Sequence, residues 1–419
     1  MLGILVGAGL VLLQVLLALP WMYVTLLTHT DRQQLRANPF QPWLLQRLYA
    51  TLAGSLLLPF VAFTFLTDKD TLENAGRVYA AILQVQITLD LFVFGFVLML
   101  WIWPKGGAVA LAAFREGTRQ PTFWLLFFLA LLLMAAWVVV PYFTFGEDYL
   151  VVKQLGYDTI MLAAVLFGTL AASLSISEEI EGRTAITVMS KPISRRQFML
   201  GKFAGITLAG LFMFGLLGVY FEGVLMVKHW WDKLEAPKES DVVQAALGVV
   251  PTPPWVNDLL TKWDLPGGPT DLLRGVFQWA AHAADTLPAL VLCFSQVMVL
   301  VALAVALATR VPMVVNLVVI LVVFLLANLT PTLLAVARKT SEEQAGSTVG
   351  RLLTFVAQVF DTLLPDLGAF TLDPALLTDA PPPFALFMKY VGSVTLYGAI
   401  YTGIVLLFGL VLFEDKDLA

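Results

Sequence analysis

The sequence has few of the residues that build disulfide, metal or catalytic sites. Its one cysteine, Cys293, lies inside an apolar run, which excludes an intramolecular disulfide framework and is typical of a small buried hydrophobe. The three histidines, His29, His229 and His282, lack the spacing of metal ligands. Phosphate-loop, nucleophile-elbow and zinc-helix motifs are all missing from the sequence. We therefore expect no metal site, no enzyme activity and no nucleotide-binding site in this chain.

Charge is also scarce, and long apolar runs take its place. Charged residues make up 13% of the 419 residues and hydrophobic residues 59%, with a mean hydropathy of +0.84. Most apolar runs are about 18 to 25 residues long, enough for a helix to cross the hydrocarbon core of a bilayer. The sequence predicts an all-α polytopic membrane protein with about nine transmembrane helices and no nucleic-acid partner. The predicted spans are residues 2–27, 48–66, 82–103, 122–142, 159–176, 203–227, 286–308, 312–336 and 390–413.

The distribution of basic residues predicts how these spans are oriented. No basic residue precedes the first run, which argues against a cleaved signal peptide and for a retained span with its N-terminus outside. With nine spans, the shorter inner segments hold 13 of the 25 basic residues, as the positive-inside rule requires. We expect a multi-pass protein of the bacterial plasma (inner) membrane with its C-terminus in the cytoplasm.

A dense charged segment, residues 177–202, interrupts two of the runs. Its three glutamates oppose the macrodipole where the preceding helix should end, so they require cationic neighbours. Gly182 is expected to close that helix, and Pro192 to end a short helix that follows it. Ser194 and Gln197 have capping-box spacing, so the next helix is predicted to begin there. This spacing alone fits both an ordinary solvated loop and a segment that transmits motion.

The order Glu-Glu-Ile-Glu-Gly-Arg-Thr, then Ser-Lys-Pro-Ile-Ser-Arg-Arg, then Gly-Lys resembles the cytoplasmic coupling segment of ABC-2 type ABC-transporter permeases. The closest resemblance is to the branch named for nitrous-oxide-reductase and multi-copper-enzyme maturation. It implies a permease subunit, in an exporter, on which a separate cytosolic ABC ATPase subunit docks and hydrolyses ATP. It also implies a second permease copy, identical or a sister chain. The residues it assigns to ATPase coupling are Glu178, Glu179, Glu181, Gly182, Arg183, Thr184, Lys191, Pro192, Ser194, Arg195 and Arg196.

The hydropathy layout extends this resemblance over residues 105–419 and divides the chain. Residues 1–104 form three extra N-terminal transmembrane helices outside the six-helix family pattern. The core would contain an elbow helix at 105–121 and outer loops at 228–285 and 337–389. Within the second loop, apolar residues at helical spacing between Val349 and Leu364 predict an amphipathic helix, which would either line an exit path or cover the bundle.

Polar groups inside the spans leave other functions open. Asp90 lies in the third run, where a carboxylate is costly, so it is either a structural residue paired with Gln86 or an ion or proton site. The second possibility would make the protein an ATP-independent carrier or channel. A third class is a non-transporting scaffold that binds a partner through its outer loops. Interhelical hydrogen bonds are the expected role of Asn316, Asn328, Ser295, Gln296, Ser393 and Thr395.

Overall fold

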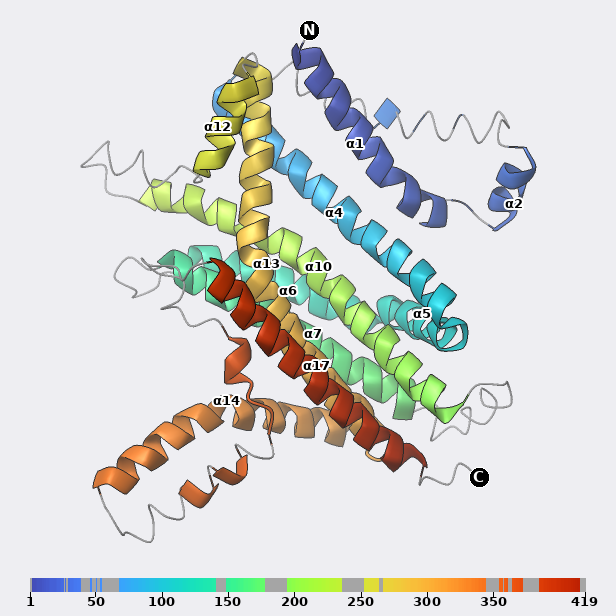
Figure 1. Cartoon of the computed structure of the whole chain (residues 1–419), viewed down its shortest axis with the longest axis vertical. Coiled ribbons are helices and arrows are strands. Elements are labelled where there is room, and N and C mark those ends of the chain that lie inside the picture. The colour runs from blue at the N-terminus through green and yellow to red at the C-terminus, as the bar shows by residue number, and fades with distance from the viewer. Residues whose placement is uncertain are drawn as a thin grey trace. The chain divides into compact units, whose positions relative to one another are not determined.

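The structure, a computed structural model, contains helices and no strands in the part of the chain that it describes (Figure 1). The described residues are 2–25, 27, 29–38, 46, 50, 53–54, 68–140, 148–177, 194–235, 252–263, 267–343, 354–356, 358–360, 364–371 and 384–414. The helices are α1 (Leu2–Thr25), α2 (His29–Ala37), α4 (Lys69–Ile102), α5 (Pro104–Arg119), α6 (Pro121–Val139), α7 (Asp148–Ala172), the π-helix η1 (Ser173–Ser177), α10 (Arg195–Glu235), α12 (Pro254–Trp263), α13 (Gly267–Ala308), α14 (Met313–Glu343), the 3-10 helix η2 (Gly368–Phe370) and α17 (Phe384–Glu414).

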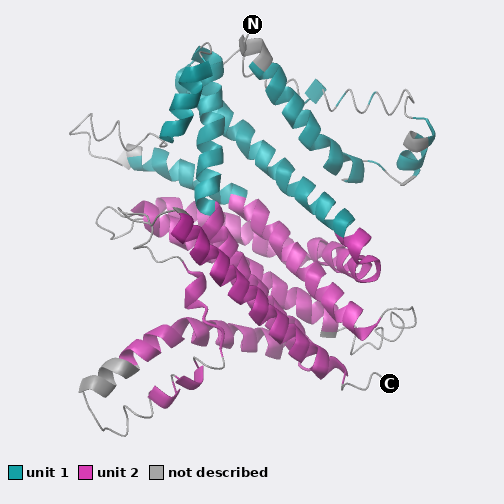
Figure 2. Cartoon of the chain, viewed as in Figure 1, with its two compact units in different colours: residues 1–98, 219–286 teal, residues 99–218, 287–419 magenta. Residues whose placement is uncertain are grey.

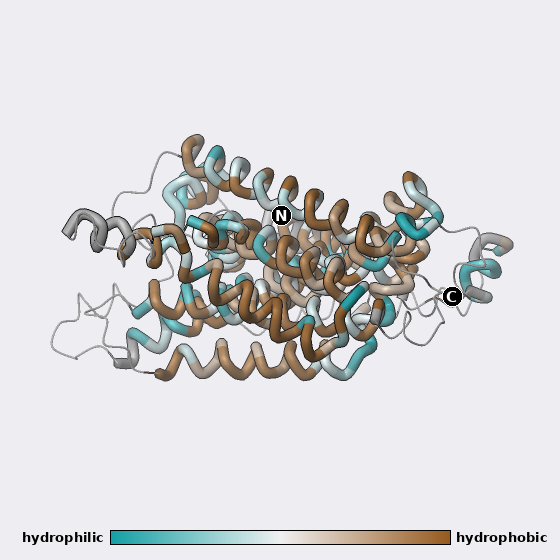
Figure 3. Tube along the Cα trace, turned by 90° about the horizontal axis from the view of Figure 1, so that it is seen from below, coloured by the Kyte–Doolittle hydropathy of each residue, from teal (hydrophilic) through white to brown (hydrophobic). Residues whose placement is uncertain are grey.

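Eight of the described helices are long and apolar enough to cross a membrane. They correspond to the first predicted span and to the third through the ninth, and Figure 3 shows hydrophobic residues along most of their length. The protein is therefore an all-α polytopic membrane protein, as predicted. The second predicted span, 48–66, lies almost entirely outside the described residues and stays a prediction.

The chain divides into two compact units (Figure 2). Unit 1 consists of residues 1–98 and 219–286, and unit 2 of residues 99–218 and 287–419. Most of the predicted N-terminal segment 1–104, its residues 1–98, thus shares a unit with a second stretch far away in sequence. The unit boundaries fall within α4, α10 and α13.

In unit 1, α1 and α4 lie side by side and run in the same direction (Figure 1). The Tyr79 hydroxyl donates to the Leu10 carbonyl, and 11 residues further along both helices the Trp21 amide donates to Asp90 Oδ1 at 3.2 Å. Parallel first and third spans are what the nine-span topology predicts, because the chain must return across the membrane between them.

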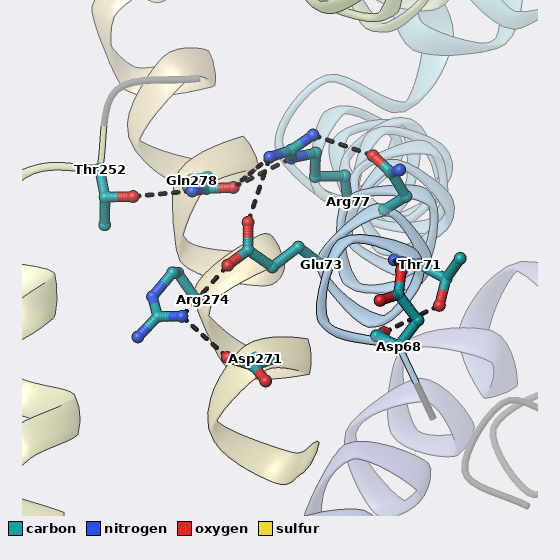
Figure 4. A network of polar contacts seen from close by, with 9 residues as sticks. Asp68, Thr71, Glu73, Arg77, Thr252, Asp271, Arg274 and Gln278 are labelled. Carbon is teal, nitrogen blue, oxygen red and sulfur yellow. Dashed lines mark hydrogen bonds and ion pairs between the residues drawn. The ribbon is translucent and has the colours of Figure 1, made fainter. Parts of the chain in front are cut away.

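The N-terminal parts of α4 and α13 approach each other closely in unit 1. A Cβ atom at Gly76 or Gly275 would collide with the backbone carbonyls of Leu272 or Glu73, so only glycine permits this spacing. Polar side chains join the same two helices (Figure 4): Glu73 accepts from Arg274 at 3.1 Å and pairs with Arg77 at 3.6 Å. The network continues through Gln278, which accepts from Arg77 at 2.8 Å and donates to Thr252 at 2.7 Å.

In unit 2, α6 packs against α7, and α14 packs against α7, η1 and η2. Phe123, Phe167 and Phe212 meet between α6, α7 and α10, where the Phe123 and Phe167 rings are edge-on with centroids 5.2 Å apart. The short η2 lies on α17, since Tyr390 donates to the Ala369 carbonyl at 2.7 Å. Of the amphipathic helix predicted within 337–389, residues 354–356 and 358–360 are helical and the others between 349 and 364 lie mostly outside the described residues.

The prediction of a loop at 228–285 is wrong for most of the residues described there, because they are helical. Here α10 continues to Glu235, α12 occupies Pro254–Trp263, and α13 begins at Gly267. Hydropathy located only the apolar part of each helix, and the polar extensions were taken for loop. Pro254 and Pro269 lie in the first turns of α12 and α13, where proline is tolerated because those amides have no intrahelical acceptor.

Candidate coupling site

Two helix ends border the predicted coupling segment. On its N-terminal side, α7 ends in the π-helix η1, a distortion that often occurs at functional sites. On its C-terminal side, α10 begins at Arg195 with the predicted capping box: the Gln197 amide donates to Ser194 Oγ, and the Ser194 amide donates to Gln197 Oε1, both at 3.2 Å. This local prediction is confirmed.

A buried lysine connects these two ends. Lys202, two turns into α10, donates to Ser175 Oγ in η1 at 2.7 Å. Its Nζ also lies 3.3 Å from Oε2 of Glu116 on α5, and Ser175 donates to the same carboxylate oxygen at 3.1 Å. Lys202 and Ser175 are buried, whereas the Glu116 side chain is 45% exposed, so the carboxylate lets two buried polar groups be satisfied from the edge of the bundle. We call this arrangement the Lys202 triad.

The predicted elbow helix, here α5, packs directly on α10. Helix α5 covers Pro104–Arg119, close to the predicted 105–121. A Cβ atom at Gly205 would collide with the Ala110 carbonyl, and one at Gly201 would press on Val109 and the Gly106 carbonyl. The glycines therefore allow near backbone contact, which leaves little room for α5 and α10 to move independently.

Three arginines gather at the C-terminus of α17. Arg195 donates to the Glu414 carbonyl at 3.0 Å, Arg196 pairs with the Glu414 carboxylate at 3.3 Å, and Arg310 donates to the Leu412 carbonyl at 3.0 Å. Cations are favourable here because the last carbonyls of a helix lack intrahelical partners and carry the negative end of its dipole. The predicted inner residues 195, 196, 310 and 414 thus lie together, as the nine-span topology requires.

Of the polar residues inside spans, Asn316 fulfils the expected interhelical role. Its Nδ2 donates to Ser173 Oγ in η1 and to the Ala304 carbonyl on α13, both at 2.9 Å. The expectation was wrong for Asn328, Ser295 and Ser393, whose side chains donate to carbonyls of their own helices. Such back-bonding satisfies a polar group in lipid without a partner helix. Asn316 therefore links the end of α7 to the α13–α14 hairpin.

Most of the predicted coupling residues lie outside the described part of the chain. These are Glu178, Glu179, Glu181, Gly182, Arg183, Thr184, Lys191 and Pro192. Ser194, Arg195 and Arg196 are described and occupy the positions given above. Asp90 belongs to unit 1, where it accepts from the Trp21 backbone amide; this is not the pairing with Gln86 that was one of the two alternatives for it.

Sequence reasoning passed over Glu222, a second acid inside a predicted span. The run 203–227 contains this glutamate, so the signal was available in the sequence. It is 1% exposed and belongs to unit 1, where Gln84 and Thr286 are its hydrogen-bond partners.

The comparison with known families bears directly on this arrangement. Residues 118–235 match the family model described as ABC-2 family transporter protein. The match covers just over a quarter of the chain, from the end of α5 to the end of α10, and includes the whole predicted coupling segment. It supports an ABC-2 type permease, the membrane-spanning part of an ABC transporter, and association with an ABC ATPase and the membrane. No match was found among curated proteins.

Proposed function

We propose that this protein is the permease subunit of an ABC-2 exporter in which residues 177–202 couple ATP hydrolysis by a separate ATPase subunit to movement of the membrane helices. Closure of the ATPase would push on the segment between η1 and α10. The nitrous-oxide-reductase maturation branch is the proposed subfamily, and the proposed location is the bacterial inner membrane with the segment in the cytoplasm.

The Lys202 triad is the observation that supports this coupling role most directly. Lys202 on α10, Ser175 in η1 and Glu116 on α5 hold three helices together next to both ends of the segment. A displacement of the segment would therefore move α5, α7 and α10 as one body. A solvated loop without a mechanical role does not require a buried lysine linking the helices on its two sides.

The partners follow from the same proposal. ATP would bind the ATPase subunits, with no cofactor in the permease. Since ABC ATPases of the resembling family act in pairs, a second permease, identical or a sister chain, would complete the transporter. Glu178, Glu181 and Arg183 would contact the ATPase, while Arg195 and Arg196 would keep the end of α17 beside the segment.

Co-purification from the native membrane tests the proposal. The tagged wild type is compared with Glu181→Lys and Arg183→Glu, and partners are identified by mass spectrometry. An ABC ATPase that accompanies the wild type and is lost from both variants supports the proposal. The control is Lys389→Glu, an equally large charge change at an exposed site on α17, which is expected to retain the ATPase.

Two outcomes would overturn the proposal. If a well-folded wild-type protein co-purifies with no ATPase, the chain is not the permease subunit of an ABC transporter. An ATPase retained by both segment variants, with unchanged ATP hydrolysis, would instead show that the coupling contact lies elsewhere in the chain.

A further inference from the structure

Unit 1 contains a buried carboxyl group for which the coupling proposal gives no role. Glu222 on α10 is 1% exposed, and its Oε1 lies 3.2 Å from Nε2 of Gln84 on α4 and 3.2 Å from Oγ of Thr286 on α13. The Trp279 indole donates to Gln84 Oε1, which leaves the Gln84 amide nitrogen toward Glu222. The hydrogen-bond partners that α4 and α13 present to this acid are thus neutral.

Glu222 and its partners also lie at the height of the middle of a candidate membrane span. Tyr79 is level with Leu10 of α1 and Asp90 is level with Trp21, so Gln84 is level with the middle of the candidate span Val6–Val24. A carboxyl group at that depth, far from water, is costly in its ionised form unless a cation offsets it.

The cations described near it in unit 1 are engaged with other acids. The titratable groups described on these helices within unit 1 are Lys69, Asp70, Glu73, Arg77, Tyr79 and Asp90 on α4, Tyr220, Lys228, His229 and Asp232 on α10, and Asp271, Arg274, His282 and Asp285 on α13. Lys228 pairs with Asp232 at 2.7 Å, and Arg77 and Arg274 both pair with Glu73. Within the described residues, Glu222 makes no ion pair and its Oε2 has no hydrogen-bond partner.

The hydrogen bonds of Thr286 also favour a neutral, protonated Glu222. Its hydroxyl has one hydrogen but lies within reach of two acceptors, the Ala283 carbonyl at 3.1 Å and Glu222 Oε1 at 3.2 Å. When the hydroxyl donates to Ala283, the short contact with Glu222 is favourable only if the carboxyl group carries a hydrogen and donates it to Thr286 Oγ. The unpartnered Oε2 is then a neutral carbonyl oxygen instead of a charged one, which lowers the cost of burying it.

We propose that Glu222 is a proton-binding site inside unit 1, with Thr286 as the residue that serves both of its charge states. In the ionised state the Thr286 hydroxyl donates to Oε1. On protonation an O–H bond forms at Oε1 with a proton from water, the Thr286 hydrogen turns to the Ala283 carbonyl, and no other bond changes. Metal ions fit less well, because the described residues offer no cluster of three or more His, Cys, Asp or Glu side chains.

Infrared difference spectroscopy of the purified full-length protein in nanodiscs tests this proposal. Spectra of the wild type and Glu222→Gln are compared across a pH series, and the carbonyl stretch of a protonated carboxylic acid is followed. We expect a band equivalent to one carboxyl per chain in the wild type that is absent from Glu222→Gln, in addition to any band of the buried Asp90, which both proteins share. Asp285→Asn, which removes an exposed acid beside Thr286, is the matched control and should retain the band.

A second variant tests the role of Thr286 independently of how well Glu222→Gln folds. Thr286→Val removes the acceptor of the carboxyl hydrogen, so the band should persist and move to higher frequency. If Glu222→Gln removes only ionised-carboxylate bands at every pH, the proposal is wrong. Carboxylate bands that respond to sodium chloride but not to choline chloride at fixed pH would also overturn it, since they identify a sodium site.

Discussion

The Nζ atom of Lys202 lies 2.7 Å from Oγ of Ser175, and this hydrogen bond joins η1, which precedes the predicted coupling segment, to α10, which follows it. Its position gives the segment a physical connection to the membrane helices.

Replacing Lys202 with methionine is expected to separate ATPase binding from coupling. The variant keeps the side-chain length but leaves Ser175 without its donor, at a cost of about 1–3 kcal/mol. The ATPase should still co-purify, while nucleotide no longer changes the mobility of a spin label at position 112, an exposed site on α5 outside the triad. Lys389→Met, the same substitution at an exposed lysine, is the control. Unchanged nucleotide response in Lys202→Met would show that the triad does not transmit motion.

Two asparagines on α14 should differ in their contribution to stability. Asn316→Ala removes bonds to two other elements, so we expect a loss of about 1 kcal/mol. Asn328→Ala removes only a bond within its own helix and should change stability less. Thermal unfolding of both variants in the same detergent measures the difference, and equal effects would argue against an interhelical role for Asn316.

Two glycines on α10 offer a matched test of the contact between α5 and α10. Gly205→Ala places a methyl group against the Ala110 carbonyl and should cost about 1–3 kcal/mol through forced backbone movement. Gly210→Ala meets nothing within 4 Å, so its effect should be within about 1 kcal/mol and can be stabilising. Unfolding midpoints decide between these outcomes, and a neutral Gly205→Ala would mean that the helices separate easily.

The topology can be tested with single cysteines, because the chain has only one to remove. In a Cys293→Ser background, Lys389→Cys should react with a membrane-impermeant maleimide applied to the outside of intact cells or spheroplasts. Arg310 lies between α13 and α14 and contacts the C-terminal end of α17, whereas Lys389 lies near its N-terminal end, so Arg310→Cys should react only after permeabilisation. The reverse pattern would invert the proposed orientation and place the coupling segment outside.

Hydropathy and local capping patterns predicted eight spans that the structure contains and the start of α10, because these features depend on nearby residues. Lipid forces apolar stretches into helices, and the Ser194 to Gln197 capping box is complete within four positions. The polar extension of α13 was missed because it is stabilised by contacts with α4, such as the hydrogen bond from Arg77 to Gln278, two residues that lie 201 positions apart in the sequence.

The candidate site was predictable in the same limited sense. Its sequence pattern marked residues 177–202, but the triad depends on Glu116, 86 positions before Lys202, and no local pattern indicates that contact. Glu222 is the opposite case: its position inside a predicted span was visible, while its partners Gln84 and Thr286 were not.

The long sequence separations within unit 1 affect how the protein is made. Gln84 and Arg77 precede Trp279 and Gln278 by about 200 positions, which a ribosome needs about 10–40 s to translate at typical rates. During that interval the first helices are already inserted, yet the side chains that will complete their polar contacts have not been synthesised. Nascent chains halted before residue 286 therefore have no route to the native unit 1, and membrane quality-control proteases have their best opportunity to act on them.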